Sequence, residues 1–333
     1  MNPRYHEVTC NGVVVRPCQP DGEVLRVENL RRAFPGTPPV EALRGVSFTV
    51  RAGEIVGLLG DNGAGKTTLL KILSTLLLPS AGGAAVCGAD LAGQARRARR
   101  HIGVVFGGDR GLYPRLSALD NIVFFGGLSG PHRHLRDRSL AALEEVGLAE
   151  RAESRVETFS KGMRQRLHLA VGMLNQPCLL MLDEPTIGLD LLEGERVREA
   201  VARLAGTGTA VLLTSHYPTD IDRLAGRVVL LESGSVSHDL PVNEFRRQAG
   251  FTAEVSLSGP GVAPRDAAEL LANASVRIQQ DEDGWRLAFQ VGAWDADVLA
   301  RLAEVVRRHP VTDIDVASPG VEAVIRRLAV NRG

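Results

Sequence analysis

The sequence predicts an α/β fold with a mostly parallel core sheet, followed by a small α+β domain. Strand-like apolar runs alternate with helical patterns over residues 23–240, as in proteins whose strands pair in parallel. One of these runs continues through a glycine-rich loop into a helical run, which is the local order of a phosphate-binding site. The pattern changes after about residue 245, so we expect a second domain over 245–333.

The first domain is expected to hold most of the strands. The predicted strands are LRVENLRRAF, VSFTV, EIVGLLG, HIGVVF, CLLMLD, TAVLLTS and VVLLESGSV, in chain order. CLLMLD (178–183) is continuously apolar, as expected of a strand that is buried on both faces of a sheet. Residues 117–175 and a segment near 192–205 have helical patterns. Residues 1–22, which contain three prolines, are expected to form an irregular extension.

The second domain has a different order of elements. Strands and helices follow one another as β-α-β-β-α-β between residues 252 and 317, and a helix over 320–330 closes the chain. This order predicts a small, ferredoxin-like α+β domain. It contains no catalytic constellation, which leaves dimer contacts or regulation as its function.

Composition excludes several classes of function. The chain has 39 basic and 39 acidic side chains, so no overall field attracts nucleic acid, and the arginine-rich run 95–101 is interpreted as a solvated helix end. The four cysteines at 10, 18, 87 and 178 form no CxxC pair and no metal-ligand spacing, which indicates a reducing compartment. No apolar run reaches about 18 residues, so we expect no membrane-spanning segment.

The loop GDNGAGKT, residues 60–67, predicts ATP binding. Gly60, Gly63 and Gly65 allow the backbone to curl so that several N–H groups point at phosphates, and the following helix adds its positive dipole end. Lys66 reaches the β- and γ-phosphates, and Thr67 offers a hydroxyl to Mg²⁺. The predicted nucleotide site also includes Asn62, Ala64 and Thr68. A chance glycine turn is disfavoured because the loop stands between a strand and a helix.

Two carboxylates lie at the end of the apolar run 178–183: Asp183 ends the run, and Glu184 follows it. At the C-terminal edge of a parallel strand, Asp183 would lie beside the phosphate loop and hold Mg²⁺ through its water shell. Glu184 is then placed to orient the attacking water or take its proton. An acidic pair exposed to solvent at the strand end is the alternative.

Taken singly, three more features have ordinary structural explanations. Ser160 has the sequence context of a helix N-cap, and Gly162 permits close approach of an anion. His216 alone is more often a structural histidine, and Phe34 is equally suited to a core position. Their order along the chain, relative to the phosphate loop and the two carboxylates, favours functional roles for these residues instead.

Together, these motifs resemble the nucleotide-binding subunit of an ABC transporter over about residues 23–240. FSKGMRQR (159–166) is similar to the family signature, usually written LSGGQ. LLMLDEP (179–185) resembles the Walker B strand with its catalytic glutamate, and IGLD, which ends at Asp190, resembles the D-loop. The resemblance implies a P-loop NTPase cassette with an antiparallel β subdomain and a helical subdomain at about 112–175.

The resemblance also implies roles for single residues and for partners. His216 falls where the family has its switch histidine, which senses γ-phosphate, and Phe34 falls where an aromatic ring stacks on adenine. Two cassettes would pack head to tail as a homodimer around two ATP molecules, so that Lys66 and Glu184 of one chain face Ser160 and Gly162 of the other. A separate transmembrane permease would hold the chain at the cytoplasmic face of the membrane.

One position departs from the family pattern. Most ABC cassettes have a glutamine after the strand that here reads IGVVF, but this chain continues with Gly107, Gly108 and Asp109. A glycine has no side chain that could coordinate Mg²⁺. We therefore expect Asp109 or a water molecule to replace the glutamine, and the glycine pair to act mainly as a hinge.

Within the family, FSKGM, GDRGLYPRLS and the C-terminal domain are most similar to single-cassette subunits of drug and antibiotic exporters of the daunorubicin-resistance type. The alternative is a non-transport ABC ATPase that acts on ribosomes or DNA. Translation factors of that kind carry two cassettes in one chain. Repair ATPases insert a long coiled coil, for which the spacing between Lys66 and Ser160 leaves no room.

Overall fold

A computed structural model of the chain describes residues 8–10, 13–15, 22–106, 111–129, 133–215, 217–271 and 276–330. The chain divides into two compact units, Met1–Pro241 and Val242–Gly333, and each is considered by itself. None of the helices within the described ranges is long and apolar enough to cross a membrane.

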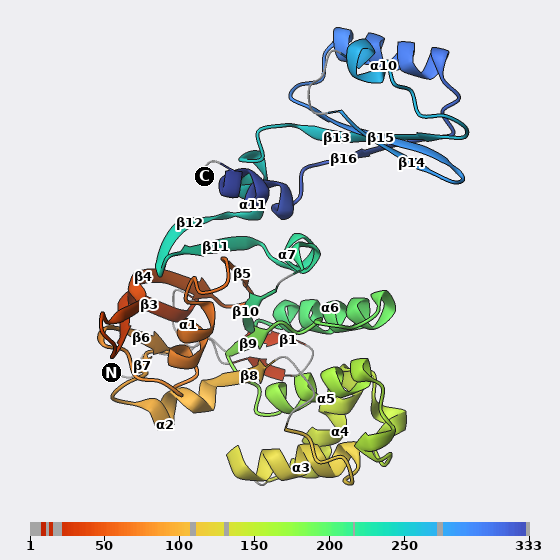
Figure 1. The fold of residues 1–333 in the computed structure, drawn as a ribbon. Coiled ribbons are helices and arrows are strands. Elements are labelled where there is room, and N and C mark those ends of the chain that lie inside the picture. The colour runs from red at the N-terminus through yellow and green to blue at the C-terminus, as the bar shows by residue number, and fades with distance from the viewer. Residues whose placement is uncertain are drawn as a thin grey trace. The chain divides into compact units, whose positions relative to one another are not determined.

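The centre of the first unit is a six-stranded sheet that is almost entirely parallel (Figure 1). Its order is β12-β11-β5-β10-β9-β8, and only β12 is antiparallel to its neighbour. The strands are β5 (Ile55–Leu59), β8 (Ile102–Phe106), β9 (Leu179–Asp183), β10 (Ala210–Thr214), β11 (Arg227–Glu232) and β12 (Ser235–Pro241). The mostly parallel core predicted from the alternating pattern is therefore confirmed.

One predicted strand is a hairpin in the structure. The run VVLLESGSV was expected to be a single strand, but it forms the end of β11, a tight turn and the start of β12. Ser233 and Gly234 lie at the turn with φ angles of 49° and 83°. Positive φ at two successive residues is the geometry of the two-residue hairpin turn, which reverses the chain direction.

A second, antiparallel sheet packs on the core of the first unit. Its order is β4-β3-β6-β7, with β3 (Glu23–Phe34), β4 (Val40–Arg51), β6 (Ala81–Val86) and β7 (Ala89–Asp90). Apolar side chains of this sheet, of β5 and of α1 (Lys66–Leu73) form one continuous buried cluster. Strands β6 and β7 were not predicted, because AGGAAV contains two glycines and only one β-branched residue, Val86.

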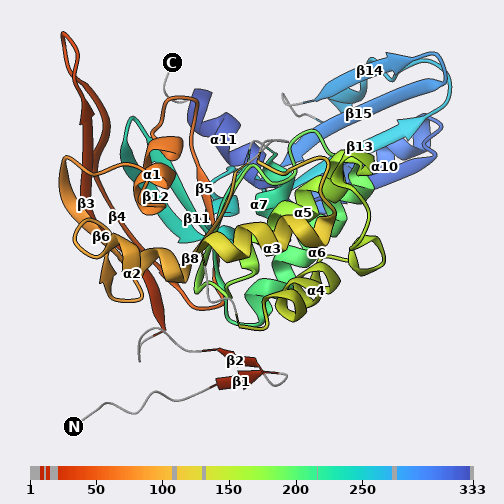
Figure 2. The ribbon, with the colours of Figure 1, turned by 90° about the horizontal axis from the view of Figure 1, so that it is seen from below.

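Three of the described helices of the first unit form a group of their own. Helices α3 (Ala118–Ser129), α4 (Leu135–Glu145) and α5 (Lys161–Met173) pack on one another as a helical subdomain (Figures 1 and 2). The others are α2 (Ala95–Ala98), α6 (Leu191–Gly206) and α7 (Pro218–Leu224), with short 3₁₀ turns η1 (Arg99–His101), η2 (Ala149–Arg151) and η3 (Val156–Thr158).

The N-terminal extension contains more structure than expected. Residues 1–22 were expected to be irregular, but β1 (Val8–Cys10) pairs in antiparallel fashion with β2 (Val13–Val15). Each of these strands has only three residues, and such short runs give too weak a pattern to be recognised in the sequence.

The second unit has a four-stranded antiparallel sheet with helix α10 along one face (Figure 1). The sheet order is β14-β15-β13-β16, and the elements follow the β-α-β-β-α-β order expected from the sequence. They are α8 (Val242–Arg247), β13 (Ala253–Gly259), α9 (Ala267–Leu271), β14 (Arg277–Asp281), β15 (Gly284–Val291), α10 (Ala296–Arg308), β16 (Asp313–Ala317) and α11 (Val321–Val330). The core contains Val255, Leu287, Phe289 and Val305.

Candidate functional site

The loop between β5 and α1 has a backbone course that requires glycine. Gly60, Gly63 and Gly65 have φ angles of 147°, 84° and 106°, in the region that side chains disfavour. A Cβ on Gly65 would also lie 2.6 Å from the carbonyl oxygen of Ala42. Helix α1 begins directly afterwards at Lys66, so its first N–H groups face the loop. Such a glycine-rich curl that ends in a helix N-terminus fits a bound phosphate chain.

Lys66 is fixed within this loop. Its ammonium group donates to the carbonyl oxygen of Gly60 at 2.5 Å and to that of Asp61 at 3.1 Å. Burial lowers the pKa of Lys66, while the nearby carboxylates of Glu184, Asp61 and Asp183 act in the opposite direction. The lysine is therefore held in the loop as a positioned donor that faces the carboxylates.

The two predicted carboxylates lie opposite the loop. A cavity of about 160 Å³ is lined on one side by residues of the loop and of the start of α1, and on the other by Asp183 and Glu184. The complete lining comprises Ala42, Asp61, Asn62, Gly63, Gly65, Lys66, Thr67, Thr68, Asp183 and Glu184. A hydroxyl and carboxylates around one cavity are the oxygen ligands that Mg²⁺ prefers, so these residues fit a magnesium nucleotide.

Thr214 holds both carboxylate residues in place, and the sequence did not indicate it. It is the register partner of Asp183 on the neighbouring parallel strand β10. Its hydroxyl donates to Asp183 Oδ1 at 2.6 Å, and its carbonyl oxygen accepts from the Glu184 N–H at 3.0 Å. Glu184 has a φ of 53°, and this contact fixes that unusual backbone. The sequence feature that could have indicated Thr214 is its position at the end of the apolar run TAVLLTS, which forms the strand paired with the one that ends in Asp183.

The other predicted site residues lie outside this cavity. Ser160 is the N-cap of α5, as its sequence context predicted, and its hydroxyl accepts from the Met163 N–H at 3.1 Å. Gly162 lies against Glu193 of α6, and an added Cβ would collide with that side chain. Asp190 caps α6 by accepting from the Glu193 N–H at 2.9 Å.

Phe34 also lies away from the cavity lining, at the end of β3. The guanidinium carbon of Arg32 lies 4.6 Å from the centre of its ring, so a cation already covers one face. Ala64, within the loop, is buried. His216 and the replacement for the missing glutamine, Gly107, Gly108 and Asp109, lie outside the described residues.

A buried aspartate that the sequence did not indicate connects three parts of the site. Asp220 in α7 is fully buried and accepts hydrogen bonds from Thr186, from Ser215 at 2.6 Å and from Arg198 at 2.8 Å. Thr186 follows the carboxylates by two residues, and Ser215 directly precedes His216. Asp220 therefore links the loop after Glu184 to the end of β10 and to helix α6.

We expect Asp220→Asn to lower the free energy of unfolding by about 3 kcal/mol, because it removes the charge opposite the buried Arg198. The matched control is Glu195→Gln, which removes the other carboxylate on Arg198. Glu195 is 40% exposed, so water replaces it and stability changes little. Urea unfolding of both variants measures the difference, and equal losses would contradict this role of Asp220.

Comparisons with known proteins show which proteins the chain is similar to. The family described as ABC transporter matches residues 43–187. The chain is 35% identical over 308 residues to the doxorubicin resistance ATP-binding protein DrrA of Mycobacterium tuberculosis, which covers 88% of this chain and 92% of that protein. It is 34% identical to the daunorubicin resistance ATP-binding protein DrrA2 of Streptomyces coeruleorubidus, over 94% of this chain and 97% of that protein.

Solved structures of ABC transporter cassettes are similar to this chain in fold. The ATP-binding subunit of an ABC transporter superposes with a TM-score of 0.60 at 30% identity, over 68% of this chain and 93% of that chain. The cassette MJ0796, in a dimeric post-hydrolysis state bound to ADP and phosphate, superposes with a TM-score of 0.58 at 25% identity, over 65% of this chain and 98% of that chain.

Proposed function

The chain belongs to the ABC transporter family, and from this premise we propose that it is the ATP-hydrolysing subunit of an exporter for drug-like or antibiotic compounds. The observation that carries the proposal is the single cavity that brings together Lys66, Thr67, Asp183 and Glu184. The cargo class comes from relatives named for resistance to doxorubicin, daunorubicin and linearmycin, which align over most of this chain.

Each residue of the cavity has its own role in ATP hydrolysis. Backbone N–H groups of the loop and the Lys66 ammonium bind the phosphates. Thr67 and Asp183 would hold Mg²⁺, which neutralises charge on the phosphates during transfer. Glu184 accepts the proton of the attacking water, and the backbone contact with Thr214 fixes its position. Thr214 holds Asp183 and the Glu184 backbone before substrate arrives, so these two residues need little reorganisation during the reaction.

We propose further that two copies associate around ATP. The segment that follows Glu184 in the chain exposes three apolar side chains: Ile187, Leu191 and Leu192, with exposed fractions of 38%, 76% and 72%. Adjacent exposed leucines at the start of α6 favour a protein contact. Ser160, the N-cap of α5, is exposed in the same chain away from its own cavity, and a second copy would bring it over the γ-phosphate. MJ0796 associates as a dimer, which supports this arrangement.

A separate membrane partner has a candidate docking surface on the helical subdomain. Tyr113, Phe124 and Phe125 form an aromatic cluster, with ring centres 4.9 to 6.0 Å apart. Tyr113 and Phe124 are 47% and 40% exposed, and Asn121 fixes the Tyr113 backbone to α3 through two hydrogen bonds. A rigid, exposed aromatic cluster is typical of an interface hot spot. The partner would hold the chain at the cytoplasmic face of the membrane.

We expect Phe124→Ala to reduce co-purification with the permease about tenfold or more, because an aromatic anchor is lost from the interface. ATP hydrolysis by the isolated chain is expected to stay unchanged. Leu140→Ala is the matched control, since Leu140 of α4 is equally exposed, at 40%. Quantitative pull-down from solubilised membranes measures the effect, and equal recovery of both variants would rule out this surface.

Identification of the co-purifying partner tests the proposed function itself. Affinity purification of the chain from its own cells, with crosslinking, is expected to recover a polytopic membrane protein. That pair should also raise the tolerated drug concentration when both genes are expressed in a sensitive host. Recovery of ribosomes or DNA in its place would overturn the exporter assignment and favour a non-transport ABC ATPase.

A further inference from the structure

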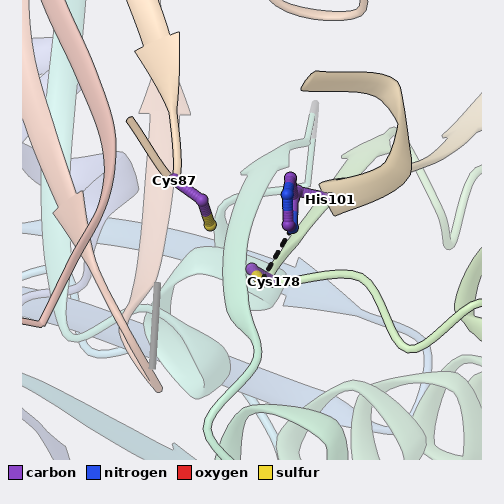
Figure 3. Close-up of side chains that lie close together, drawn as sticks. All are labelled: Cys87, His101 and Cys178. Carbon is purple, nitrogen blue, oxygen red and sulfur yellow. Dashed lines mark hydrogen bonds between the residues drawn. The ribbon is translucent and has the colours of Figure 1, made fainter. Parts of the chain in front are cut away.

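Cys87, His101 and Cys178 lie close together outside the ATP site, with polar atoms within 4.8 Å of one another (Figure 3). Cys87 is disulfide-bonded, a bond that the spacing of the cysteines did not indicate. The Cys178 sulfur lies 3.6 Å from His101 Nδ1, at hydrogen-bond distance. This group therefore does not offer two thiolates to a metal ion. A cavity in the second unit is different, because its polar side chains face open space.

This second cavity has a volume of about 440 Å³, and all the residues that line it belong to the second unit. It lies between α8, the segment 250–252, Gly292 after β15, and the segment 318–319 before α11. Sites for small molecules usually have volumes of about 300–1,000 Å³. The second unit therefore has room for a ligand of its own, and the cavity shares no residue with the ATP site.

Helix α8 directs two arginines at this cavity. Asn243, Arg246 and Arg247 stand at positions i, i+3 and i+4, which share one face of a helix, and all three line the cavity. Val242 and Phe245 of the same helix are buried. Because burial of these apolar side chains fixes the rotation of the helix, the polar face stays turned toward the cavity.

The other walls combine hydroxyl groups with an apolar surface. Thr252 is fixed in place: its hydroxyl donates to the Gly292 carbonyl oxygen at 2.6 Å, and its N–H donates to the Val291 carbonyl oxygen at 2.7 Å. Ser318 adds an exposed hydroxyl, while the half-buried Phe251 adds an aromatic ring. The cavity therefore suits a ligand with one charged part and one apolar part.

The charge around the cavity is positive. Among the described residues that line it there are two arginines and no carboxylate. A third guanidinium group, that of Arg327, lies against Gly250 in the wall and donates to the Gln248 carbonyl oxygen at 3.0 Å. Cationic walls around a concave surface concentrate anions there. The ligand is therefore expected to be an anion.

We propose that this cavity binds a phosphate ester. The Arg247 guanidinium matches phosphate oxygens in a bidentate manner, and Asn243 and Ser318 donate from two different walls. A tetrahedral phosphate offers oxygens toward both walls, whereas a planar carboxylate offers only two oxygens in one plane. Phe251 contacts the organic part of the ester, which fills the volume that an inorganic ion leaves open.

A structural role for the arginines is the alternative. Arg246 and Arg247 lie in the last turn of α8, where positive charge stabilises a helix C-terminus. That role predicts no binding of phosphate esters at all. If a ligand does bind, it has two sources, a soluble metabolite or the headgroup of a phospholipid, because both present the same phosphate group to Arg247.

Tryptophan fluorescence measures binding locally, because both tryptophans of the chain, Trp285 and Trp294, lie in the second unit. Trp294 is 40% exposed and follows Gly292 of the cavity wall by two residues. Full-length protein is titrated with phenyl phosphate, and with benzyl alcohol as an uncharged aromatic reference. We expect a saturable change with phenyl phosphate and none with benzyl alcohol.

Arg247→Ala is expected to weaken phenyl phosphate binding about tenfold or more, because a charge-assisted contact is lost. Arg247→Lys keeps the charge without the planar fork, so it should retain part of the affinity. Arg326→Ala is the matched control, since Arg326 is an exposed arginine of α11 that does not line the cavity. Its affinity should equal that of the wild type.

Co-sedimentation with phosphatidylcholine vesicles that contain phosphatidic acid tests the lipid source. Binding that needs phosphatidic acid and is lost in Arg247→Ala supports a phospholipid headgroup, and a response to phenyl phosphate alone supports a soluble ester. Absence of both responses in the wild type, or equal losses in Arg247→Ala and Arg326→Ala, would overturn the proposal. Neither measurement uses ATP hydrolysis, so failure of this site remains distinct from failure of the exporter assignment.

Discussion

Glu184→Gln is expected to bind ATP normally and to hydrolyse it about 10²–10⁴ times more slowly than the wild type, because the amide cannot accept the proton of the attacking water. The side chain keeps its shape, and the backbone N–H of residue 184 still donates to the Thr214 carbonyl oxygen, so the cavity is preserved. The steady-state rate and the ATP dissociation constant, measured on the same preparation, separate the chemical step from binding.

The same variant is expected to accumulate as an ATP-bound dimer, since hydrolysis is the step that releases the two chains. Size-exclusion chromatography with and without ATP detects the shift. Glu199→Gln is the matched control: Glu199 lies on α6 with 61% of its side chain exposed, so this variant should turn over like the wild type. If Glu184→Gln hydrolysed ATP at the wild-type rate, the proposed role of Glu184 would be wrong.

Lys66→Ala is expected to weaken ATP binding about 10–100-fold, because it removes the charged donor of the phosphate loop. In the structure this ammonium group already points at the loop, through its bonds to the carbonyl oxygens of Gly60 and Asp61. Phosphate binding exchanges those contacts for stronger ones to anionic oxygens. Equilibrium titration with a fluorescent ATP analogue measures the loss.

Lys71→Ala is the control for that experiment. Lys71 lies on the same helix α1, five residues further on, with its side chain exposed to solvent. Its removal lowers the charge of the chain by the same amount but leaves the loop unchanged, so ATP affinity should stay near that of the wild type. Equal losses of ATP affinity in both variants would show that binding depends on the overall charge of the chain, and that Lys66 makes no specific contact with phosphate.

The backbone course of the phosphate loop was predictable because it depends on consecutive residues. Gly60, Gly63 and Gly65 adopt the positive φ angles that the pattern requires, and Lys66 begins α1 as expected. The carboxylates were predictable because a continuous apolar run that ends in Asp183 identifies the edge of a buried parallel strand. In both cases the predicted geometry belongs to one short segment of the chain.

The sequence failed where local signals were weak or ambiguous. Strands β6 and β7 contain alanine and glycine and gave no strand pattern, and the short run at Ser233–Gly234 concealed a hairpin turn. These features depend on neighbouring strands for their stability. Propensity within a short window therefore cannot reveal them.

The sequence by itself determined the family, the phosphate loop and the order of the two units, because each follows from residues that are adjacent or regularly spaced. Only the tertiary structure decided that Thr214 holds the carboxylates, that Asp220 connects three segments, and that Cys87 meets His101 and Cys178. The physical reason is strand register and packing. These place side chains from distant segments a few ångströms apart, and no local pattern encodes that distance.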